Sequence, residues 1–321
     1  MSLSKKALSL VNTFVTNKVW PTELCEIEYF GTIIGGEEPS KYSKSPFLWN
    51  KFFKLCGLKG IFTASDLPLK SKLGEFISIL LSFPECVDIT ITSPYKNYAY
   101  CCLDSLQIDQ FKFEISERVQ NLECLNHIIP DHLKKTIYID NTDGQGMILA
   151  LKKRKNIDGA HVLLVGAGGA AASIGYELVK AGADLKIVNI IKEDAETLGR
   201  KLDLFKKAGR SVIAGGWEQI KKWAPKADII VSAISASTPL SEKEIAYVQS
   251  DCLFADTRYG NNGEFAIIAK NAGRPWVDGK EMLYGQFELA AVRVGNILGI
   301  ETSLLKSSLE TIREEFIFGK L

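Results

Sequence analysis

Short runs of apolar and β-branched residues alternate along the chain with longer stretches whose apolar positions recur at the spacing of one helix face. The first runs, at 29–34, 60–64 and 87–92, are predicted strands, and the stretches between them, 46–56 and 69–83, are predicted helices. Alternation of this kind is typical of α/β folds, in which helices cover a sheet.

The pattern is less regular at both ends of this region. Residues 109–135 contain at least one predicted strand, near 122–129, and a further strand follows at 136–140. Residues 1–27 mix polar and apolar positions, with a predicted helix over 5–15. We interpret residues 1–27 as an extension and not as part of the core.

A new alternation of strand and helix begins after residue 143. A strand at 161–165, a helix that ends at Lys180 and a strand at 185–189 form a βαβ unit. Further predicted strands lie at 211–214, 229–232, 253–256 and 275–277, and further predicted helices at 146–153, 194–207, 217–223, 242–247, 264–272, 281–298 and 304–318. We expect two domains: a discontinuous α/β domain with a mixed sheet, 1–142 and 277–321, and a doubly wound domain, 143–276.

The composition favours a small-molecule partner. With 39 basic and 38 acidic residues among 321, the formal charge of +1 gives no field to attract nucleic acid or a membrane surface. No apolar run approaches the roughly 20 residues that span a bilayer, and no signal peptide is apparent. We therefore expect a cytoplasmic protein that binds neither nucleic acid nor membrane.

Cysteine and histidine give no sign of a metal or disulfide framework. The seven cysteines form no CxxC pair, so we interpret them as reduced thiols, with adjacent Cys101 and Cys102 as small buried hydrophobes. The three histidines are not spaced as a metal pair. We expect no catalytic metal.

A glycine-rich turn lies between the first strand and the helix of the βαβ unit. Gly166, Gly168 and Ala171 match G-x-G-x-x-[GA], in which the first glycine permits a tight turn, the second lets a pyrophosphate approach the backbone, and the small third residue allows close packing. The free N–H groups of the helix N-terminus suit phosphates. The sequence predicts a dinucleotide site in a Rossmann-type domain, with contacts from Gly166, Ala167, Gly168, Gly169 and Ala170.

The choice of nicotinamide depends on the tip of the second strand. NAD-binding domains usually place Asp or Glu there, whereas this chain has Asn189, followed by Ile190 and Ile191. Lys192 is a candidate for contact with a 2′-phosphate, although it equally suits a solvated helix position. We favour NADP and leave NAD open.

Polar clusters follow the predicted strands of the first domain, at 42–46, 90–96 and 141–144, with Asn126 between the last two. Each cluster alone has an ordinary structural explanation; Ser43 and Ser45, for example, could cap the helix that starts near Pro46. Together they carry a resemblance.

From about Tyr29 to the C-terminus the chain resembles the shikimate dehydrogenase family. The family's S-x-S-P-x-x-H-N corresponds to Ser43–Asn50 with Trp49 in place of histidine, and its N-x-T-x-P-x-K corresponds to Thr90–Lys96 with Thr90 in place of asparagine. Its N-T-D-G-x-G is matched fully by Asn141–Gly146.

Further matches extend the resemblance. Asn126 stands where the family has an asparagine ahead of the catalytic aspartate, followed here by His127 in place of threonine. Asp256 to Tyr259, the segment 279–283 and Gln286 also look like family features. The resemblance implies additional dinucleotide contacts from Gly279 and Met282.

The resemblance implies reversible reduction of 3-dehydroshikimate to shikimate with NADPH, a step of chorismate and aromatic amino acid biosynthesis. Reduction of a ketone leaves an alkoxide that needs a proton, which Lys96 can supply. A carboxylate such as Asp143 favours the charged ammonium, so we expect these two residues to be the catalytic pair. We expect the substrate to be held by Ser43, Ser45, Thr90, Thr92, Asn126 and Gln286.

Departures from the family pattern keep alternatives open. Trp49 and Thr90 would change the substrate wall, and the usual basic residues are replaced by Ile190 and Ala172, which weakens a 2′-phosphate site. The family's N-A-T is replaced by Ser232-Ala233-Ile234, which changes local cofactor contacts. A quinate or cyclitol dehydrogenase that uses NAD, and a non-catalytic regulator of the same fold, are the alternatives. We expect a monomer or homodimer, and the chain could derive from a multifunctional polypeptide.

Overall fold

The computed structural model describes residues 11–17, 27–106, 108, 110–235, 238–260 and 263–319. The chain divides into two compact units, which we call unit 1, Met1–Thr142 with Phe287–Leu321, and unit 2, Asp143–Gln286. The chain returns from unit 2 to unit 1 within helix α13 (Gly279–Ile297). The boundary predicted from the sequence, at 276–277, lies ahead of that helix. The functions assigned to the two parts stay predictions.

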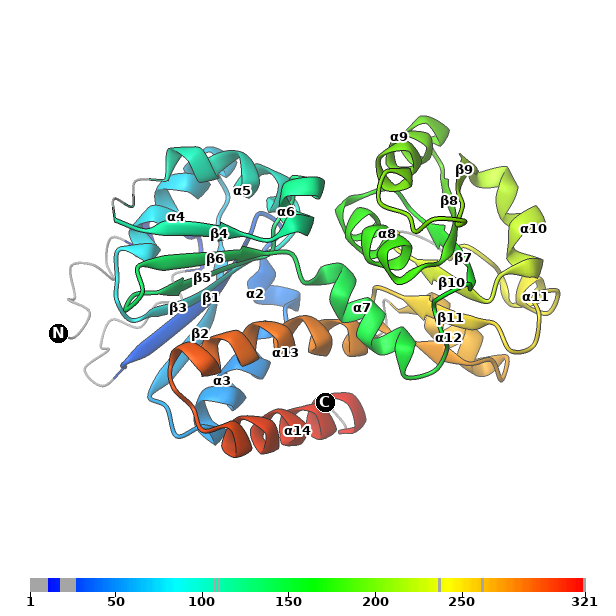
Figure 1. Cartoon of the computed structure of the whole chain (residues 1–321). Coiled ribbons are helices and arrows are strands. Elements are labelled where there is room, and N and C mark those ends of the chain that lie inside the picture. Colours follow the sequence, from blue (N-terminus) through cyan, green and yellow to red (C-terminus); the bar gives the residue numbers. More distant parts are fainter. Residues whose placement is uncertain are drawn as a thin grey trace. The chain divides into compact units, whose positions relative to one another are not determined.

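Unit 1 contains a six-stranded mixed sheet in the order β2-β1-β3-β5-β6-β4 (Figure 1). Its strands are β1 (Tyr29–Gly35), β2 (Gly60–Asp66), β3 (Cys86–Ile91), β4 (Lys112–Ile115), β5 (His127–Asp131) and β6 (Thr136–Asp140). Strand β5 runs antiparallel to both of its neighbours, β3 and β6, and the other pairings are parallel. The prediction of a mixed sheet is confirmed.

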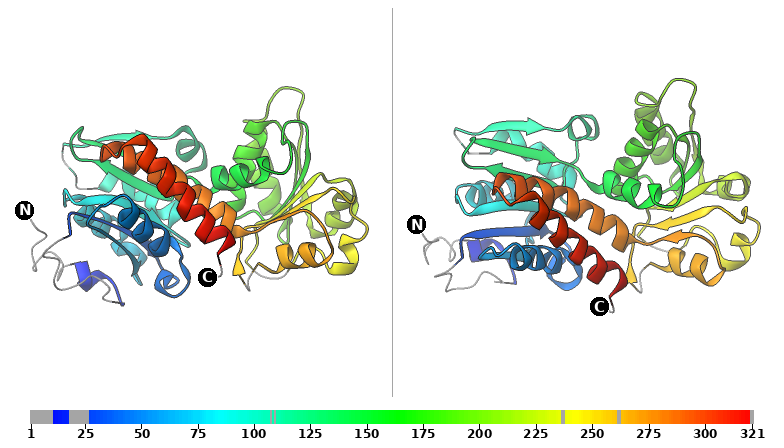
Figure 2. Two further views of the ribbon diagram at one scale, coloured as in Figure 1. Left: turned by 90° about the horizontal axis from the view of Figure 1, so that it is seen from below. Right: turned by 60° about the horizontal axis from the view of Figure 1, so that its bottom comes forward.

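Helices cover both faces of this sheet. They are α2 (Pro39–Tyr42), α3 (Ser45–Leu55), α4 (Leu73–Leu81), α5 (Lys96–Cys102), α6 (Glu117–Leu122) and α14 (Thr302–Phe318), with short 3-10 turns at Lys70–Lys72 and Leu103–Ser105. One core joins α4 and α5 to the strands through residues such as Phe76 and Ile89. In Figure 2, α14 lies beside α13, where a Cβ on Gly295 would come within 2.9 Å of Leu305.

Trp49 belongs to an aromatic cluster inside unit 1. It is 1% exposed, stacks on Phe62 at 5.3 Å between ring centroids and meets Phe287 edge to face at 5.3 Å. The expectation that Trp49 changes the wall of the substrate site is therefore wrong, because its ring packs α3 and α13 against β2. A tryptophan buries more apolar area than histidine and suits that place.

The irregular stretch before β6 contains more structure than the pattern indicates. The strand predicted near 122–129 is β5, which begins later, at His127, and the stretch also forms edge strand β4 and helix α6, with Leu122 in the helix. Strand β4 alternates between exposed and half-buried positions, so it lacks the apolar run on which strand prediction depends.

Residues 11–17 are part of the core of unit 1. Val11 and Val15 are buried in it, and the ring of Phe14 stacks on Phe76 at 5.4 Å. Asn17 donates to the Ala64 carbonyl at 2.7 Å and accepts the Asp66 N–H at 3.3 Å. The interpretation of this segment as an extension is wrong, because it covers the free edge of β2, whose polar groups need partners.

The predicted helix over 5–15 is only partly testable. Residues 11–14 are helical, and residues 5–10 lie outside the described residues.

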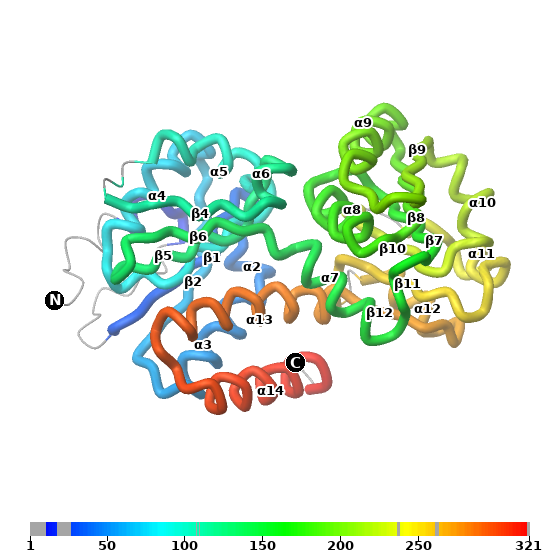
Figure 3. The backbone as a smooth tube through the Cα atoms, viewed as in Figure 1, coloured from blue at the N-terminus to red at the C-terminus, as the bar shows by residue number. Residues whose placement is uncertain are grey.

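Unit 2 contains six parallel strands in the order β12-β11-β10-β7-β8-β9. They are β7 (His161–Val165), β8 (Asp184–Asn189), β9 (Val212–Gly216), β10 (Ile229–Ser232), β11 (Leu253–Asp256) and β12 (Trp276–Val277). From β7 the chain winds first through β8 and β9, and then on the other side through β10 to β12 (Figure 3). This is the doubly wound order of a Rossmann-type domain, and the predicted fold class is confirmed.

The helices of unit 2 connect these strands. They are α7 (Asp143–Lys152), α8 (Gly169–Ala181), α9 (Lys192–Asp203), α10 (Ile220–Trp223), α11 (Glu242–Ile245) and α12 (Glu264–Asn271), with 3-10 turns at Trp217–Gln219 and Ala224–Lys226. In a doubly wound sheet, ligands bind beyond the carboxyl ends of the strands where the winding reverses. Here that place lies between β7 and β10.

We predict that Asn17→Ala lowers the free energy of unfolding by about 1–3 kcal/mol, because it leaves the Ala64 carbonyl and the Asp66 N–H without a partner. Urea unfolding of the full chain measures the change. Gln120→Ala is the control, since this exposed side chain donates one long bond of 3.4 Å. Equal stability of the two variants would contradict the place given to residues 11–17.

Candidate active site

Three chain segments of unit 1 meet at the edge where β3 ends. The Ile91 N–H donates to the Asn126 carbonyl at 2.8 Å, and the Asn126 N–H donates to the Asp140 carbonyl at 3.0 Å. The side chain of Asn126, 1% exposed, accepts the Thr142 N–H at 2.9 Å and donates to Thr142 Oγ1 at 3.1 Å. The ends of β3, β5 and β6 are thereby fixed to one another.

Ser43 and Ser45 lie between α2 and α3. Ser45 is buried and opens α3, and its N–H donates to Ser43 Oγ at 3.2 Å. The N-cap position itself is held by Lys44, without a side-chain cap. Of the two serines, only Ser43 has a side chain that accepts a hydrogen bond from the start of α3.

Tyr42, Thr92 and Lys96 come together beyond the end of β3. Burial raises the pKa of the Tyr42 hydroxyl, while a hydrogen bond with the Thr92 side chain and the charge of Lys96 act in the opposite direction. Lys96 is half-buried at the first position of α5. Two hydrogen-bonded hydroxyls thus lie within the field of a cation, a combination that suits a polar oxygen-rich ligand.

Tyr42 is absent from the predicted site residues although it directly precedes Ser43 in the sequence. A tyrosine in a short helix has many ordinary roles, and only the fold brings its hydroxyl to Thr92. Position beside the serine motif is the one signal that could have indicated it.

Thr90 is 7% exposed and lies near the end of β3, two positions before Thr92, which follows the strand. Its hydroxyl donates to Asp88 Oδ2 at 2.6 Å. The Thr90 hydroxyl therefore has no proton left to donate to a ligand.

The aspartate of the N-T-D-G-x-G motif opens unit 2. Asp143 is 1% exposed at the start of α7 and follows Thr142 directly in the chain. Lys96 belongs to unit 1 and Asp143 to unit 2, so their pairing stays a prediction, as does the role of half-buried Gln286.

The glycines of this motif permit helix packing in unit 2. The Gly144 N–H donates to Ser173 Oγ at 2.9 Å, and a Cβ on Gly144 would overlap the Ser173 carbonyl. A Cβ on Gly146 would overlap the Met282 carbonyl. The motif therefore combines a candidate catalytic aspartate with close contacts of α7 to α8 and α13.

The glycine-rich turn after β7 has the geometry of an anion site. Gly166 has φ of 118°, and a Cβ there would lie 2.6 Å from the Ala233 carbonyl, so the turn requires glycine. A Cβ on Gly168 would meet no atom within 4 Å, and α8, which Gly168 caps, has no side-chain cap. The open space and the free helix N-terminus suit a pyrophosphate.

A second observation at the same place favours a dinucleotide. Ser232, at the end of β10 beside Val165, has a buried hydroxyl with no hydrogen-bond partner among the residues that the structure describes. Buried hydroxyls normally have a partner, so a ligand at the point where the winding reverses would satisfy it.

The tip of β8 offers little positive charge. Ile190 and Ile191 are 73% and 56% exposed, and Lys192 forms an ion pair with Glu196 at 3.3 Å. Asn189 donates to the Ile191 carbonyl at 3.2 Å. Lys192 is thus an exposed, ion-paired helix residue at the position predicted for a 2′-phosphate contact.

Gly279 and Met282 lie in the first turns of α13. The Gly279 N–H donates to the Arg258 carbonyl at 2.9 Å, and Met282 is 5% exposed. Nearby Asp256 accepts the N–H groups of Arg258 and Phe265, and burial raises the pKa of its carboxyl group.

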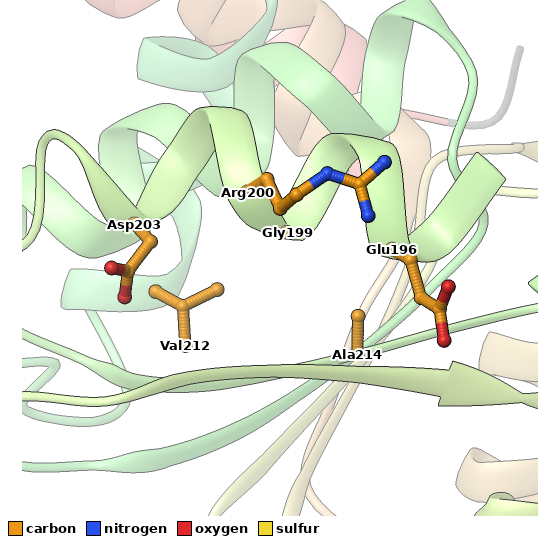
Figure 4. A pocket seen from close by; sticks show the side chains of 6 residues that line it. All are labelled: Glu196, Gly199, Arg200, Asp203, Val212 and Ala214. Carbon is orange, nitrogen blue, oxygen red and sulfur yellow. The ribbon is translucent and has the colours of Figure 1, made fainter. Parts of the chain in front are cut away.

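A hollow of about 400 Å³ lies between α9 and β9 (Figure 4). The residues that line it are Glu196, Gly199, Arg200, Asp203, Val212 and Ala214. They include none of the residues predicted to bind the dinucleotide.

Six cysteines lie within the described part of the chain, and all are free thiols. Cys102 is buried as expected, whereas Cys101 is exposed, so the interpretation of the pair as buried hydrophobes is wrong for Cys101. Successive positions of α5 face different directions, which separates the two. Burial raises the pKa of the Cys252 thiol to about 12.

Within the described ranges, the structure shows no cluster of three or more His, Cys, Asp or Glu able to hold a metal. Over the same residues, no helix is long and apolar enough to cross a membrane.

Comparisons with known proteins agree with this architecture. The family model of shikimate/quinate 5-dehydrogenases matches residues 148–253, and that of the shikimate dehydrogenase substrate binding domain matches residues 33–112. The shikimate dehydrogenase (NADP(+)) of Helicobacter pylori strain P12 is 30% identical over 268 residues, which cover 78% of this chain and 88% of the relative.

Solved structures share the fold. Shikimate 5-dehydrogenase from Listeria monocytogenes, in complex with shikimate and NAD, superposes with a TM-score of 0.70 at 19% identity, covering 90% of this chain and 97% of the other. The 5-ketofructose reductase of a Gluconobacter strain superposes with a TM-score of 0.68 at 23% identity, covering 89% and 99%.

The mixed-sheet unit and the doubly wound unit with its glycine-rich turn, together with the NADP(+)-dependent relatives, define a nicotinamide-dependent oxidoreductase. Within that class, the chain belongs to the shikimate dehydrogenase family.

Proposed function

We propose that the protein catalyses the reversible reduction of 3-dehydroshikimate to shikimate with NADP as the cofactor. The observation that carries the proposal is the hydrogen bond between the Tyr42 and Thr92 side chains, beyond the end of β3 and within the field of the Lys96 charge. The relatives named for shikimate and NADP(+) support the choice of substrate and cofactor. Unit 1 would then bind the substrate and unit 2 the dinucleotide.

Lys96 is the proposed proton donor. A bound nicotinamide supplies the hydride, and the carbonyl oxygen that becomes an alkoxide takes a proton from the Lys96 ammonium. In the oxidation direction the neutral amine takes this proton back. The carboxylate of Asp143 is the proposed partner that favours the charged form of the amine.

Polar groups of unit 1, together with Gln286 of unit 2, would hold the ring carboxylate and hydroxyls. Ser43, Ser45 and Thr92 offer hydroxyls, which donate and accept hydrogen bonds, and Asn126 and Gln286 offer amides. We add Tyr42, whose hydroxyl lies with Thr92 and Lys96. Several directional bonds of this kind are what a polyol needs for selective binding.

The dinucleotide would be held by the glycine-rich turn and its surroundings. The N–H groups at the start of α8 suit the pyrophosphate, and the orphaned Ser232 hydroxyl offers a further contact. Gly166, Ala167, Gly168, Gly169, Ala170, Asn189, Lys192, Gly279 and Met282 are the proposed contact residues.

NAD is the second candidate cofactor. Exposed Ile190 and ion-paired Lys192 leave the tip of β8 poor in free positive charge, which favours a ribose without a 2′-phosphate. Quinate is the second candidate substrate, since the matching family model covers both compounds.

The direct test is the initial rate of nicotinamide reduction with shikimate or quinate, and with NADP or NAD, each varied separately. We expect turnover of shikimate. If the protein binds cofactor and yet turns over neither compound, the proposal is overturned in favour of a non-catalytic regulator.

We predict that Lys96→Ala lowers kcat by roughly 10²–10⁴-fold while the affinity for dinucleotide, measured by fluorescence titration, stays the same. Lys54→Ala, at an exposed position of α3, is the matched control and should keep the wild-type rate. A Lys96→Ala enzyme as fast as the control would exclude Lys96 as the proton donor.

We predict that Ile190→Arg raises the preference for NADP over NAD about tenfold, because a hydrogen bond to a charged group contributes about 1.5–3 kcal/mol. The side chain is 73% exposed, so the substitution disturbs little packing. The ratio of kcat/KM values for the two cofactors measures the effect. Ile190→Gln is the uncharged control, and an equal shift in both variants would contradict an electrostatic cause.

A further inference from the structure

Three polar side chains are buried together on one face of the sheet of unit 1. Asp88 is 0% exposed, Thr90 7% and His127 3%. Asp88 and Thr90 are two positions apart on β3, so their side chains lie on the same face of the strand. Thr90 is paired in register with His127 of antiparallel strand β5. Burial of such groups is unfavourable unless they are hydrogen-bonded, so their contacts decide what they can do.

Asp88 is the centre of this cluster. His127 Nδ1 lies 2.8 Å from Asp88 Oδ1, and Thr90 donates to Asp88 Oδ2 at 2.6 Å. The distance of 3.5 Å between Thr90 Oγ1 and His127 Nδ1 is longer than either bond. Each carboxylate oxygen therefore has one partner, and Asp88 fixes both neighbours.

The carboxylate also fixes the tautomer of the histidine. A bond from Nδ1 to a carboxylate places the proton on Nδ1, which leaves the lone pair of a neutral ring on Nε2. Among the described residues, no hydrogen bond to His127 Nε2 is found beside those to Nδ1. His127 thus offers an oriented acceptor that the rest of unit 1 does not use.

The cluster borders the candidate substrate residues. Thr92 directly follows the last residue of β3, two positions after Thr90 and no more than about 7 Å further along the chain. His127 directly follows Asn126, whose side chain fixes Thr142. An acceptor at this depth is placed to meet a group of a ligand that also reaches Thr92.

We propose that His127 is a specificity-determining residue whose Nε2 accepts a hydrogen bond from a ring hydroxyl of the substrate that does not react, with Asp88 and Thr90 as its positioning residues. This inference rests on the proposed function and deepens it. Thr90 then acts through His127, because its own proton goes to Asp88. A hydroxyl at this ring position is what the site selects.

The rival explanation is a buried pair that contributes only to packing. The two explanations differ in their dependence on Nε2. An asparagine amide can take the place of Nδ1 and donate to Asp88, but it reaches no further, whereas a glutamine amide reaches the place of Nε2 and offers its oxygen there.

The experiment compares His127→Asn and His127→Gln with wild-type enzyme, using shikimate and analogues in which one non-reacting hydroxyl is replaced by hydrogen. We expect His127→Asn to raise the KM for shikimate roughly tenfold or more, with dinucleotide affinity unchanged and a smaller rise for His127→Gln. One deoxy analogue should give wild-type enzyme and His127→Asn the same KM, because the missing bond is the same.

His132→Asn is the matched control, since this second histidine of unit 1 lies next to Phe111, with 5.5 Å between ring centroids, and has no part in the cluster. Its KM should equal that of wild type. Melting temperatures show which variants fold. If His127→Asn does not fold, the KM values of wild-type enzyme and His127→Gln for shikimate and the deoxy analogues test the inference instead.

Two negative results are distinguishable. Active wild-type enzyme together with an unchanged KM in the folded His127 variant overturns this inference alone. Wild-type enzyme that turns over no shikimate overturns the proposed function and this inference with it.

Discussion

The hydrogen bonds that join the ends of β3, β5 and β6 are the constraint on which the candidate site depends. Ile91, Asn126 and Asp140 are linked through their backbones, and the Asn126 side chain binds Thr142 from both its amide nitrogen and its oxygen. Lys96 follows β3 and Asp143 follows Thr142. The same few bonds therefore fix the chain next to both proposed catalytic residues. Loss of the contacts between Asn126 and Thr142 would leave buried hydrogen-bonding groups unsatisfied at this edge.

Much of the fold could be predicted because its signals are local. The strands of unit 2 are apolar runs in a fully covered parallel sheet, and the glycine-rich turn needs Gly166 for a positive φ, so both features are visible in short stretches of sequence. The candidate site residues of unit 1 could be predicted for a different reason: they stand in ordered motifs that the family shares. Their roles were not deducible from residue type alone.

The features that could not be predicted depend on contacts between distant parts of the chain. Residues 11–17 belong to the core because they cover the edge of β2, and nothing in their own composition indicates this partner. Trp49 occupies a motif position and yet packs in the core, since Phe62 and Phe287 surround it. The bond of Asp88 to His127 joins residues that are neighbours only after β3 and β5 pair.

The fold alone does not fix the substrate, since a 5-ketofructose reductase shares it at similar coverage. Under the proposed function, the side chains at the strand ends would determine selectivity, and the reaction would combine hydride transfer with transfer of a separate proton. The most direct test uses shikimate with deuterium on the carbon that bears the oxidised hydroxyl, followed by mass spectrometry of the cofactor. The account predicts deuterium in the reduced nicotinamide; deuterium released into water would contradict it.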